Sequence, residues 1–150
     1  MEFAKSGLGV GFYSTAETSR LLRVHRETLR RWVMGYTFKG RSGRPEQQAA
    51  LIPPSLPRLD GQVALSFVDL IELRVVKALI ERGLSLQGVR KARDLAQKHF
   101  PVQHPFASRP VYTPRQGRRK SVFIQTFEGE DLEDGAFIEW PAPGHLSQVE

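Results

Sequence analysis

The sequence predicts a mainly α-helical protein with a small amount of β-structure. Three observations support this fold class: serine-initiated helical patterns recur along the chain, a proline- and glycine-rich segment interrupts them, and two short β-branched runs follow. The 150-residue chain has no cysteine, which excludes disulfides and cysteine-based zinc sites. It shows neither an apolar run long enough for a membrane span nor a secretory signal, so we expect a cytoplasmic protein.

The first predicted helix covers about residues 15–22. Ser14 and Glu17 have the spacing of a capping box, in which the serine hydroxyl accepts from the glutamate amide and the carboxylate reaches back. The face that we expect this helix to bury consists of Ala16, Ser19 and Leu22. Because so short a helix buries little surface, it needs a partner.

A second predicted helix, over about residues 26–34, follows a turn at Arg23 and Val24. Gly35 comes where a glycine often ends a helix, since glycine adopts a left-handed backbone without strain. The expected buried face has apolar residues spaced three or four apart, namely Leu29, Trp32 and Val33. Two helices of this length cannot form a core alone, so a third element must pack against them.

Residues 36–65 break the helical pattern and contain four prolines, Pro45, Pro53, Pro54 and Pro57. We predict an extended excursion, arranged as a loose hairpin with short strands near residues 36–38 and 63–65. Its first half groups three basic residues: Lys39, Arg41 and Arg44. They form either a wing that follows DNA phosphates or a solvated loop, and the sequence leaves both interpretations open.

The longest predicted helix covers about residues 67–82 and opens with a second capping signal at Ser66 and Asp69. Its apolar residues cover most of the circumference: Phe67, Leu70, Ile71, Leu73, Val75, Val76, Ala78, Leu79 and Ile80. A helix that is apolar nearly all round is buried on several sides. We therefore expect this helix to be the central element of the core.

Gly83 ends that helix, and Ser85 caps a fourth one over about residues 86–99. Its expected buried stripe consists of Leu86, Val89, Ala92 and Ala96. Four basic residues are expected on its exposed surface: Arg90, Lys91, Arg93 and Lys98. Pro101 and Pro105 are predicted to end the helix.

The C-terminal part of the sequence predicts a β-hairpin and an acidic tail. Strands over residues 111–113 and 122–126 flank a turn at Gln116 and Gly117. From Glu128 onward the chain is acidic, but four apolar residues interrupt the charge: Leu132, Phe137, Ile138 and Trp140. These are the candidate partner-binding residues, because aromatic anchors are enriched at interfaces. A tail that masks the basic face, or that is simply disordered, is the alternative.

The net charge of +6 is distributed unevenly along the chain. Residues 1–64 hold ten Lys or Arg and five Asp or Glu, and residues 65–127 hold twelve and four. Residues 128–150 hold no Lys or Arg and seven Asp or Glu. A basic body of this kind attracts polyanions, so we expect a nucleic-acid partner, with solubility alone as the alternative.

The first helical pair has the form of a helix-turn-helix whose second helix could enter a DNA major groove. Arg26 could pair bidentately with guanine, and Thr28 could meet a thymine methyl group or a phosphate. The alternative is a structural helical hairpin with solvated arginines. The candidate DNA-binding residues are Ser14, Thr15, Arg20, His25, Arg26, Thr28, Arg30, Arg31, Lys39, Arg41 and Arg44.

Enzyme motifs are not found in the sequence. The four histidines, His25, His99, His104 and His145, lack carboxylate partners at metal-ligand spacing. A glycine-rich phosphate loop, a nucleophile elbow and paired carboxylates are also missing. We therefore predict a protein that is not an enzyme and that needs no cofactor or metal.

Five segments resemble one known family: YSTAE at 13–17, TLRRW at 28–32, LSFVDLIELRVV at 65–76, RGLSL at 82–86 and HPFA at 104–107. The first four resemble the MerR-type winged helix-turn-helix domain, and with the fifth they look like bacterial VapB-type antitoxins. The resemblance covers about residues 12–126. His25 stands where the family has a small cap, Arg23 stands where it has glycine, and the chain is shorter than its relatives tend to be.

We therefore expect a flexible N-terminus (1–11), a MerR-like winged helix-turn-helix (12–100) with its basic wing at 36–65, a β-hairpin extension (101–127) and an acidic tail (128–150). The resemblance bears on the second of these segments and on the hairpin. It implies a homodimeric repressor that binds double-stranded operator DNA of its own operon. It also implies a toxin partner of the PIN-domain ribonuclease class. Effector sensing is not expected, because the MerR effector domain is missing. The alternative is an interaction module whose C-terminal hairpin and tail neutralise a partner, with DNA binding secondary.

Overall fold

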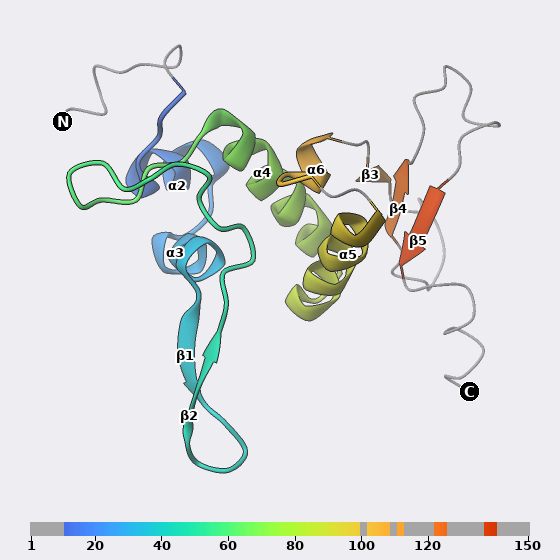
Figure 1. The fold of residues 1–150 in the computed structure, drawn as a ribbon, viewed down its shortest axis with the longest axis horizontal. Coiled ribbons are helices and arrows are strands. Elements are labelled where there is room, and N and C mark those ends of the chain that lie inside the picture. Colours follow the sequence, from blue (N-terminus) through green and yellow to red (C-terminus); the bar gives the residue numbers. More distant parts are fainter. Residues whose placement is uncertain (1–10, 100–101, 109–110, 113–121, 126–136, 141–150) are drawn as a thin grey trace. The chain divides into compact units, whose positions relative to one another are not determined.

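The computed structural model describes residues 11–99, 102–108, 111–112, 122–125 and 137–140 (Figure 1). The chain divides into two compact units, Met1–Leu73 and Arg74–Glu150. The boundary falls within helix α4, which covers Phe67–Glu81. In the described part, every helix is too short or too polar to cross a lipid bilayer.

Helix α2 covers Thr15–Leu22, as predicted from the capping box. The Glu17 amide donates to the Ser14 hydroxyl (3.1 Å), and that hydroxyl donates to the Glu17 carboxylate (3.2 Å). The predicted buried face is wrong in detail, because Thr18 is the fully buried residue and Ala16, Ser19 and Leu22 are half-buried. Thr18 tolerates burial since its hydroxyl donates to the Ser14 carbonyl (2.8 Å).

Helix α3 covers Arg26–Met34 and buries Leu29, Trp32 and Val33, which confirms the second predicted helix and its face. Arg23 makes the turn between α2 and α3 with a left-handed backbone (φ 55°). Gly35 ends α3 with φ 76°, as its glycine predicted. A side chain at Gly35 would also collide with the Gln48 carbonyl.

A two-stranded antiparallel hairpin follows α3 directly and projects away from α2 (Figure 1). Strand β1 covers Tyr36–Lys39 and pairs with β2, Pro45–Gln48. The prediction that residues 63–65 supply the partner strand is therefore wrong. A nearby strand closes a shorter loop at lower entropic cost, and proline is tolerated at the first position of a strand.

The two ends of segment 49–65 pack into the core of the first unit, so the segment is not a loose excursion. Leu51 and Ile52 are buried, and both amides donate to the Trp32 carbonyl at the end of α3 (2.8 and 3.0 Å). Leu65 is also buried and exchanges two 2.8 Å backbone hydrogen bonds with Tyr13. This segment is the third element that α2 and α3 require.

Helix α4 confirms the predicted capping signal and begins at the predicted residue. The Asp69 amide donates to the Ser66 hydroxyl (3.1 Å), and the Ser66 amide donates to the Asp69 carboxylate (2.9 Å). Its surface differs from the prediction, because Phe67 is 56% exposed while the acidic residues Asp69 and Glu72 are fully buried. Hydrogen bonds from Ser55 and Ser66 satisfy the Asp69 carboxylate, so this charged group tolerates burial. A prediction from apolarity alone would bury Phe67 instead.

Helix α5 covers Leu86–His99 and has the predicted serine cap, in which the Gly88 amide donates to the Ser85 hydroxyl (3.0 Å). The predicted stripe is confirmed for three of its residues, which are buried, while Leu86 is half-buried. Arg93 was expected at the surface but is buried. Its guanidinium donates to the Gln103 carbonyl (3.0 Å), which satisfies a charged group in the interior.

Helix α6 covers Pro105–Ser108, so Pro105 begins a short helix instead of ending α5. This is the position where the missing amide of proline costs least.

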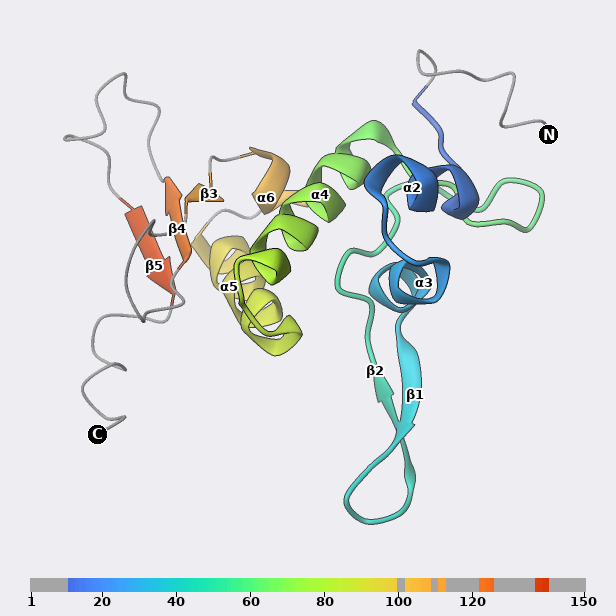
Figure 2. The ribbon, with the colours of Figure 1, turned by 180° about the vertical axis from the view of Figure 1, so that it is seen from behind.

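The second unit also contains a three-stranded antiparallel sheet in the order β3-β4-β5, and α5 contacts β5 (Figure 2). Strands β3 (Val111–Tyr112) and β4 (Val122–Gln125) confirm the predicted hairpin. Strand β5, Phe137–Trp140, was not predicted and comes from the acidic segment. The expected turn at Gln116 and Gly117 and the candidate Leu132 lie outside the described residues.

Candidate nucleic-acid interface

Helix α3 is anchored on one side and exposed on the other. Leu29, Trp32 and Val33 attach it to the first unit, where Trp32 also accepts the two amides from residues 51 and 52. The other six residues of the helix are exposed: Arg26, Glu27, Thr28, Arg30, Arg31 and Met34. The helix therefore presents an exposed face that carries three arginines.

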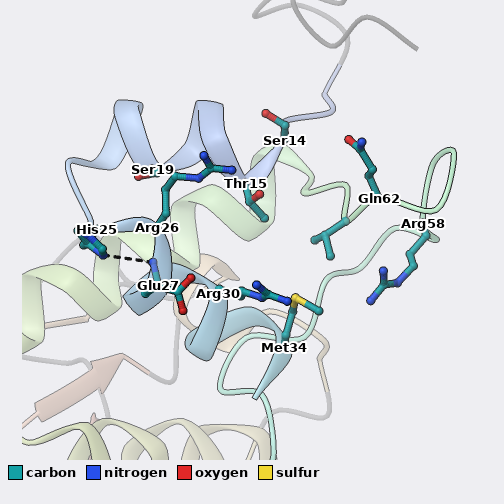
Figure 3. Close-up of a pocket in the computed structure, with 11 residues that line it drawn as sticks. Ser14, Thr15, Ser19, His25, Arg26, Glu27, Arg30, Met34, Arg58 and Gln62 are labelled. Carbon is teal, nitrogen blue, oxygen red and sulfur yellow. Dashed lines mark hydrogen bonds between the residues drawn. The ribbon is translucent and has the colours of Figure 1, made fainter. Parts of the chain in front are cut away.

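An open groove of about 740 Å³ lies along this face (Figure 3). Its walls come from α2 and its N-cap, from α3 and from residues 58–63. The lining residues are Ser14, Thr15, Ser19, His25, Arg26, Glu27, Arg30, Met34, Arg58, Gln62 and Val63. They include three arginines and one carboxylate, so the groove is positively charged.

Five of the candidate residues line this groove: Ser14, Thr15, His25, Arg26 and Arg30. Within the part of the chain that the structure describes, neither Arg26 nor Arg30 forms an ion pair with a carboxylate. Figure 3 shows Arg26 directed toward α2 and Arg30 directed toward Met34. Cations held without an internal counter-charge attract an external polyanion.

His25 lies immediately before α3 and caps it. Its Nδ1 atom accepts from the Glu27 amide at 3.3 Å (Figure 3). The imidazole therefore supplies the acceptor that a serine or threonine usually supplies.

Arg31 lies outside the groove and contacts the hairpin. Its guanidinium carbon is 5.5 Å from the centroid of the Tyr36 ring, which is a cation–π distance. The Tyr36 ring is in turn tilted against Phe38, with 6.0 Å between the ring centroids. Arg31 thus connects α3 to β1.

The other candidates lie outside the groove. Arg20 is exposed in the last turn of α2, and Thr28 is exposed on α3. Lys39, Arg41 and Arg44 are exposed on the hairpin β1–β2. The structure therefore places the three basic residues of the hairpin on a different element from the arginines of α3.

Arg58 and Gln62 line the groove but were not among the candidates. A local signal was available, because Asp60-Gly61 is the dipeptide most typical of a tight two-residue turn. That signal predicts the turn, whereas the position of the turn opposite α3 depends on tertiary packing.

In the described ranges, no three histidine, aspartate or glutamate side chains gather into a possible metal site.

Residues 11–93 match the protein family described as "Putative DNA-binding HTH domain". Over 105 residues the chain is 34% identical to a protein of Mycobacterium tuberculosis (strain ATCC 25618 / H37Rv) named "Putative antitoxin VapB45". This match covers 69% of the chain but 43% of that relative, so the chain spans less than half of the relative's length. No solved structure matches the chain.

Proposed function

Since the chain belongs to this family of DNA-binding helix-turn-helix domains, we propose that it is a sequence-specific transcriptional regulator. Its partner is double-stranded operator DNA. The observation that supports this proposal best is the exposed face of α3, on which Arg26 and Arg30 have no carboxylate partner among the described residues.

In the proposed complex, α3 enters the major groove with its first turn toward the base edges. Arg26 reads guanine, while Arg30, the α2 N-terminus at Ser14 and Thr15, and Arg20 contact phosphates. The hairpin β1–β2 acts as the wing of a MerR-type winged helix-turn-helix, and its three cations follow the flanking backbone. This assignment is supported by the direct connection of β1 to α3 through Gly35 and by the Arg31–Tyr36 contact.

We extend the proposal to a type II antitoxin that represses its own operon as a homodimer. The similarity to the mycobacterial relative supports this role. The toxin partner would be a PIN-domain ribonuclease, bound through the C-terminal sheet and the acidic segment. The charge of that segment, seven acidic residues and no Lys or Arg over 128–150, suits a cationic toxin surface.

Fluorescence anisotropy with the duplex upstream of the chain's own reading frame tests DNA binding. If about five phosphates are neutralised per protomer, log K should fall with log salt at a slope of about −4 to −5 per protomer. An unrelated duplex of equal length is the control and should bind more weakly. Salt-independent binding, or equal affinity for both duplexes, would contradict a sequence-specific regulator.

A further inference from the structure

We infer that His25 is a positioning residue that makes sequence discrimination by α3 depend on pH. Its neutral imidazole holds the first turn of α3 in order, and its protonation releases that turn. This inference rests on the proposed function and deepens it, because it assigns a regulatory role to the residue that caps the helix carrying Arg26.

The chain is fixed on both sides of the first turn of α3. Before it, the Val24 amide donates to the Ser19 carbonyl (3.2 Å), and the Ser19 hydroxyl donates to the Val24 carbonyl (2.6 Å). After it, Leu29 is fully buried and its amide donates to the His25 carbonyl at 2.9 Å. Between these points the side chains of residues 26–28 are all exposed, so core packing does not hold them.

The His25 side chain supplies a hydrogen bond to this exposed turn. The first amides of an α-helix have no intrahelical acceptor, and the Nδ1 atom of His25 accepts from the Glu27 amide at 3.3 Å. Nδ1 accepts only while it carries no proton, so the proton of the neutral ring is on Nε2. The cap therefore requires one tautomer of the neutral imidazole.

Protonation of His25 removes the cap. Nδ1 becomes a donor, and the Glu27 amide loses its acceptor. The imidazolium then lies at the N-terminus of α3, where the helix dipole disfavours a positive charge. Histidine ordinarily changes charge between about pH 5 and pH 8, whereas a serine, threonine or asparagine cap carries no charge in that range.

The charged groups around His25 are mostly arginines, which stay protonated throughout this range. Helix α2 and its N-cap line the groove with hydroxyl side chains. The charged side chains that line the groove beside His25 are Arg26, Glu27, Arg30 and Arg58. The charged residues of α2 and of the turn after it are Glu17, Arg20 and Arg23.

Loss of the cap affects base reading more than phosphate binding. Arg26 belongs to the turn that the cap orders, and a turn that is disordered in the free protein must be ordered when base contacts form. Phosphate contacts carry no sequence information, and the added positive charge strengthens them. Protonation therefore lowers the ratio of the affinities for the preferred and an unrelated duplex.

Fluorescence anisotropy at about pH 7.5 and about pH 5.5, at one ionic strength, measures this ratio on either side of the ordinary histidine titration. We expect the wild-type ratio to fall roughly fivefold at the lower pH, which is the effect of losing one typical cap. His25→Asn keeps an acceptor and does not titrate, so its ratio should be equal at both pH values. A His25→Asn protein with the wild-type fall would overturn the inference.

His25→Ala separates the cap from the ring. Both variants lack the imidazole, but asparagine supplies an acceptor and alanine does not. At the higher pH we expect the ratio for His25→Ala to be severalfold below that for His25→Asn. Equal ratios would contradict a positioning role for the cap.

Glu27→Gln is the matched control for the neighbouring carboxylate. It removes the charge but keeps the backbone amide that donates to His25, so the pH dependence of the wild type should remain. Loss of that dependence in Glu27→Gln would assign the titration to Glu27 and overturn the inference.

A measurement without DNA separates this inference from the proposed function. Nitrogen-15 NMR of the free chain should show the neutral His25 ring protonated at Nε2 and unprotonated at Nδ1. If the wild type does not bind duplex DNA, the proposed function is wrong, whatever the tautomer. If it binds DNA with sequence preference but His25 carries its proton on Nδ1, or the ratio does not change with pH, only the role of His25 is wrong.

Discussion

His25 and Arg23 occupy positions where the family that the sequence resembles has a small cap and a glycine. The imidazole of His25 accepts the Glu27 amide and so replaces the hydroxyl of a serine cap. Arg23 adopts a left-handed backbone with φ 55°, which costs a non-glycine residue about 1–2 kcal/mol. Both residues are therefore compatible with the helix-turn-helix geometry, although the backbone of Arg23 is strained.

The first prediction concerns base reading by Arg26. We expect Arg26→Ala to lose about 1–3 kcal/mol on the preferred duplex and to relax the preference at one base pair, because a bidentate contact to guanine is removed. Competition binding with single-substituted duplexes measures this effect.

The control for Arg26 is Arg20→Ala, which removes an exposed charge outside the groove. It should weaken all duplexes similarly. If Arg26→Ala behaves in the same way, Arg26 contacts the backbone and does not read a base.

At the scale of elements, a backbone junction and a cation–π contact connect the hairpin β1–β2 to α3. Gly35 forms the junction at an angle that glycine alone adopts easily, and Arg31 covers the Tyr36 ring. We expect this contact to help orient the hairpin relative to α3. Its effect on DNA binding should therefore exceed its small effect on stability.

The second prediction tests this connection. Tyr36→Leu removes the ring but keeps every charge, and we expect DNA affinity to fall by up to about fivefold, since an exposed cation–π pair contributes about 0.5–1 kcal/mol. Tyr36→Phe keeps the ring and should bind like the wild type. Anisotropy at fixed salt separates the variants, and similar losses in both would assign the effect to the tyrosine hydroxyl.

The third prediction concerns the attachment of residues 49–65 to α4. One carboxylate oxygen of Asp69 accepts from Ser55 and from the Ser66 amide, and Asp69 is fully buried. We expect Asp69→Ala to destabilise the protein by about 3 kcal/mol, because several charge-assisted hydrogen bonds to a fully buried carboxylate are lost and their donors stay partly buried.

Asp69→Asn should cost less than Asp69→Ala, because its amide oxygen still accepts. Thermal or urea unfolding measures both variants. Equal stability of Asp69→Ala and the wild type would show that this hydrogen-bond network is not important for the fold.

At the scale of the whole molecule, the basic and acidic parts of the sequence have different expected partners. The first unit carries the cationic groove, whereas the acidic segment contributes β5 to the sheet of the second unit. Deletion of residues 128–150 would remove β5 and leave an edge of β4 unpaired. Charge substitution is therefore a cleaner test of the proposed toxin binding than truncation.

The fourth prediction is that neutralising five acidic residues weakens toxin binding and leaves DNA binding intact. The variant replaces Glu128, Glu130 and Glu133 by Gln and Asp131 and Asp134 by Asn. Its co-purification with the product of the neighbouring gene should fall, because charge complementarity speeds association. Exchanging Asp and Glu at these five positions is the control. Full retention of the toxin by the neutral variant would contradict an electrostatic role of the acidic segment.

Much of the secondary structure could be predicted from the sequence, but only part of the candidate interface. The bounds of α2 and α3 follow from Ser14 and Gly35, and Arg26 and Arg30 were expected on the exposed face. Arg58 could not be placed in the groove in this way. Its position depends on hydrogen bonds from residues 51, 52 and 55 to Trp32 and Asp69, which are distant in sequence.

Sequence alone therefore determined where the four main helices begin, because a cap is a contact between residues two or three positions apart. Tertiary structure decided which strand pairs with β1, which polar residues are buried in α2 and α4, and that the acidic segment forms β5. These outcomes depend on competition among distant partners for hydrogen bonds and apolar surface. Local sequence patterns carry no information about this competition, so its outcome is seen only in the folded chain.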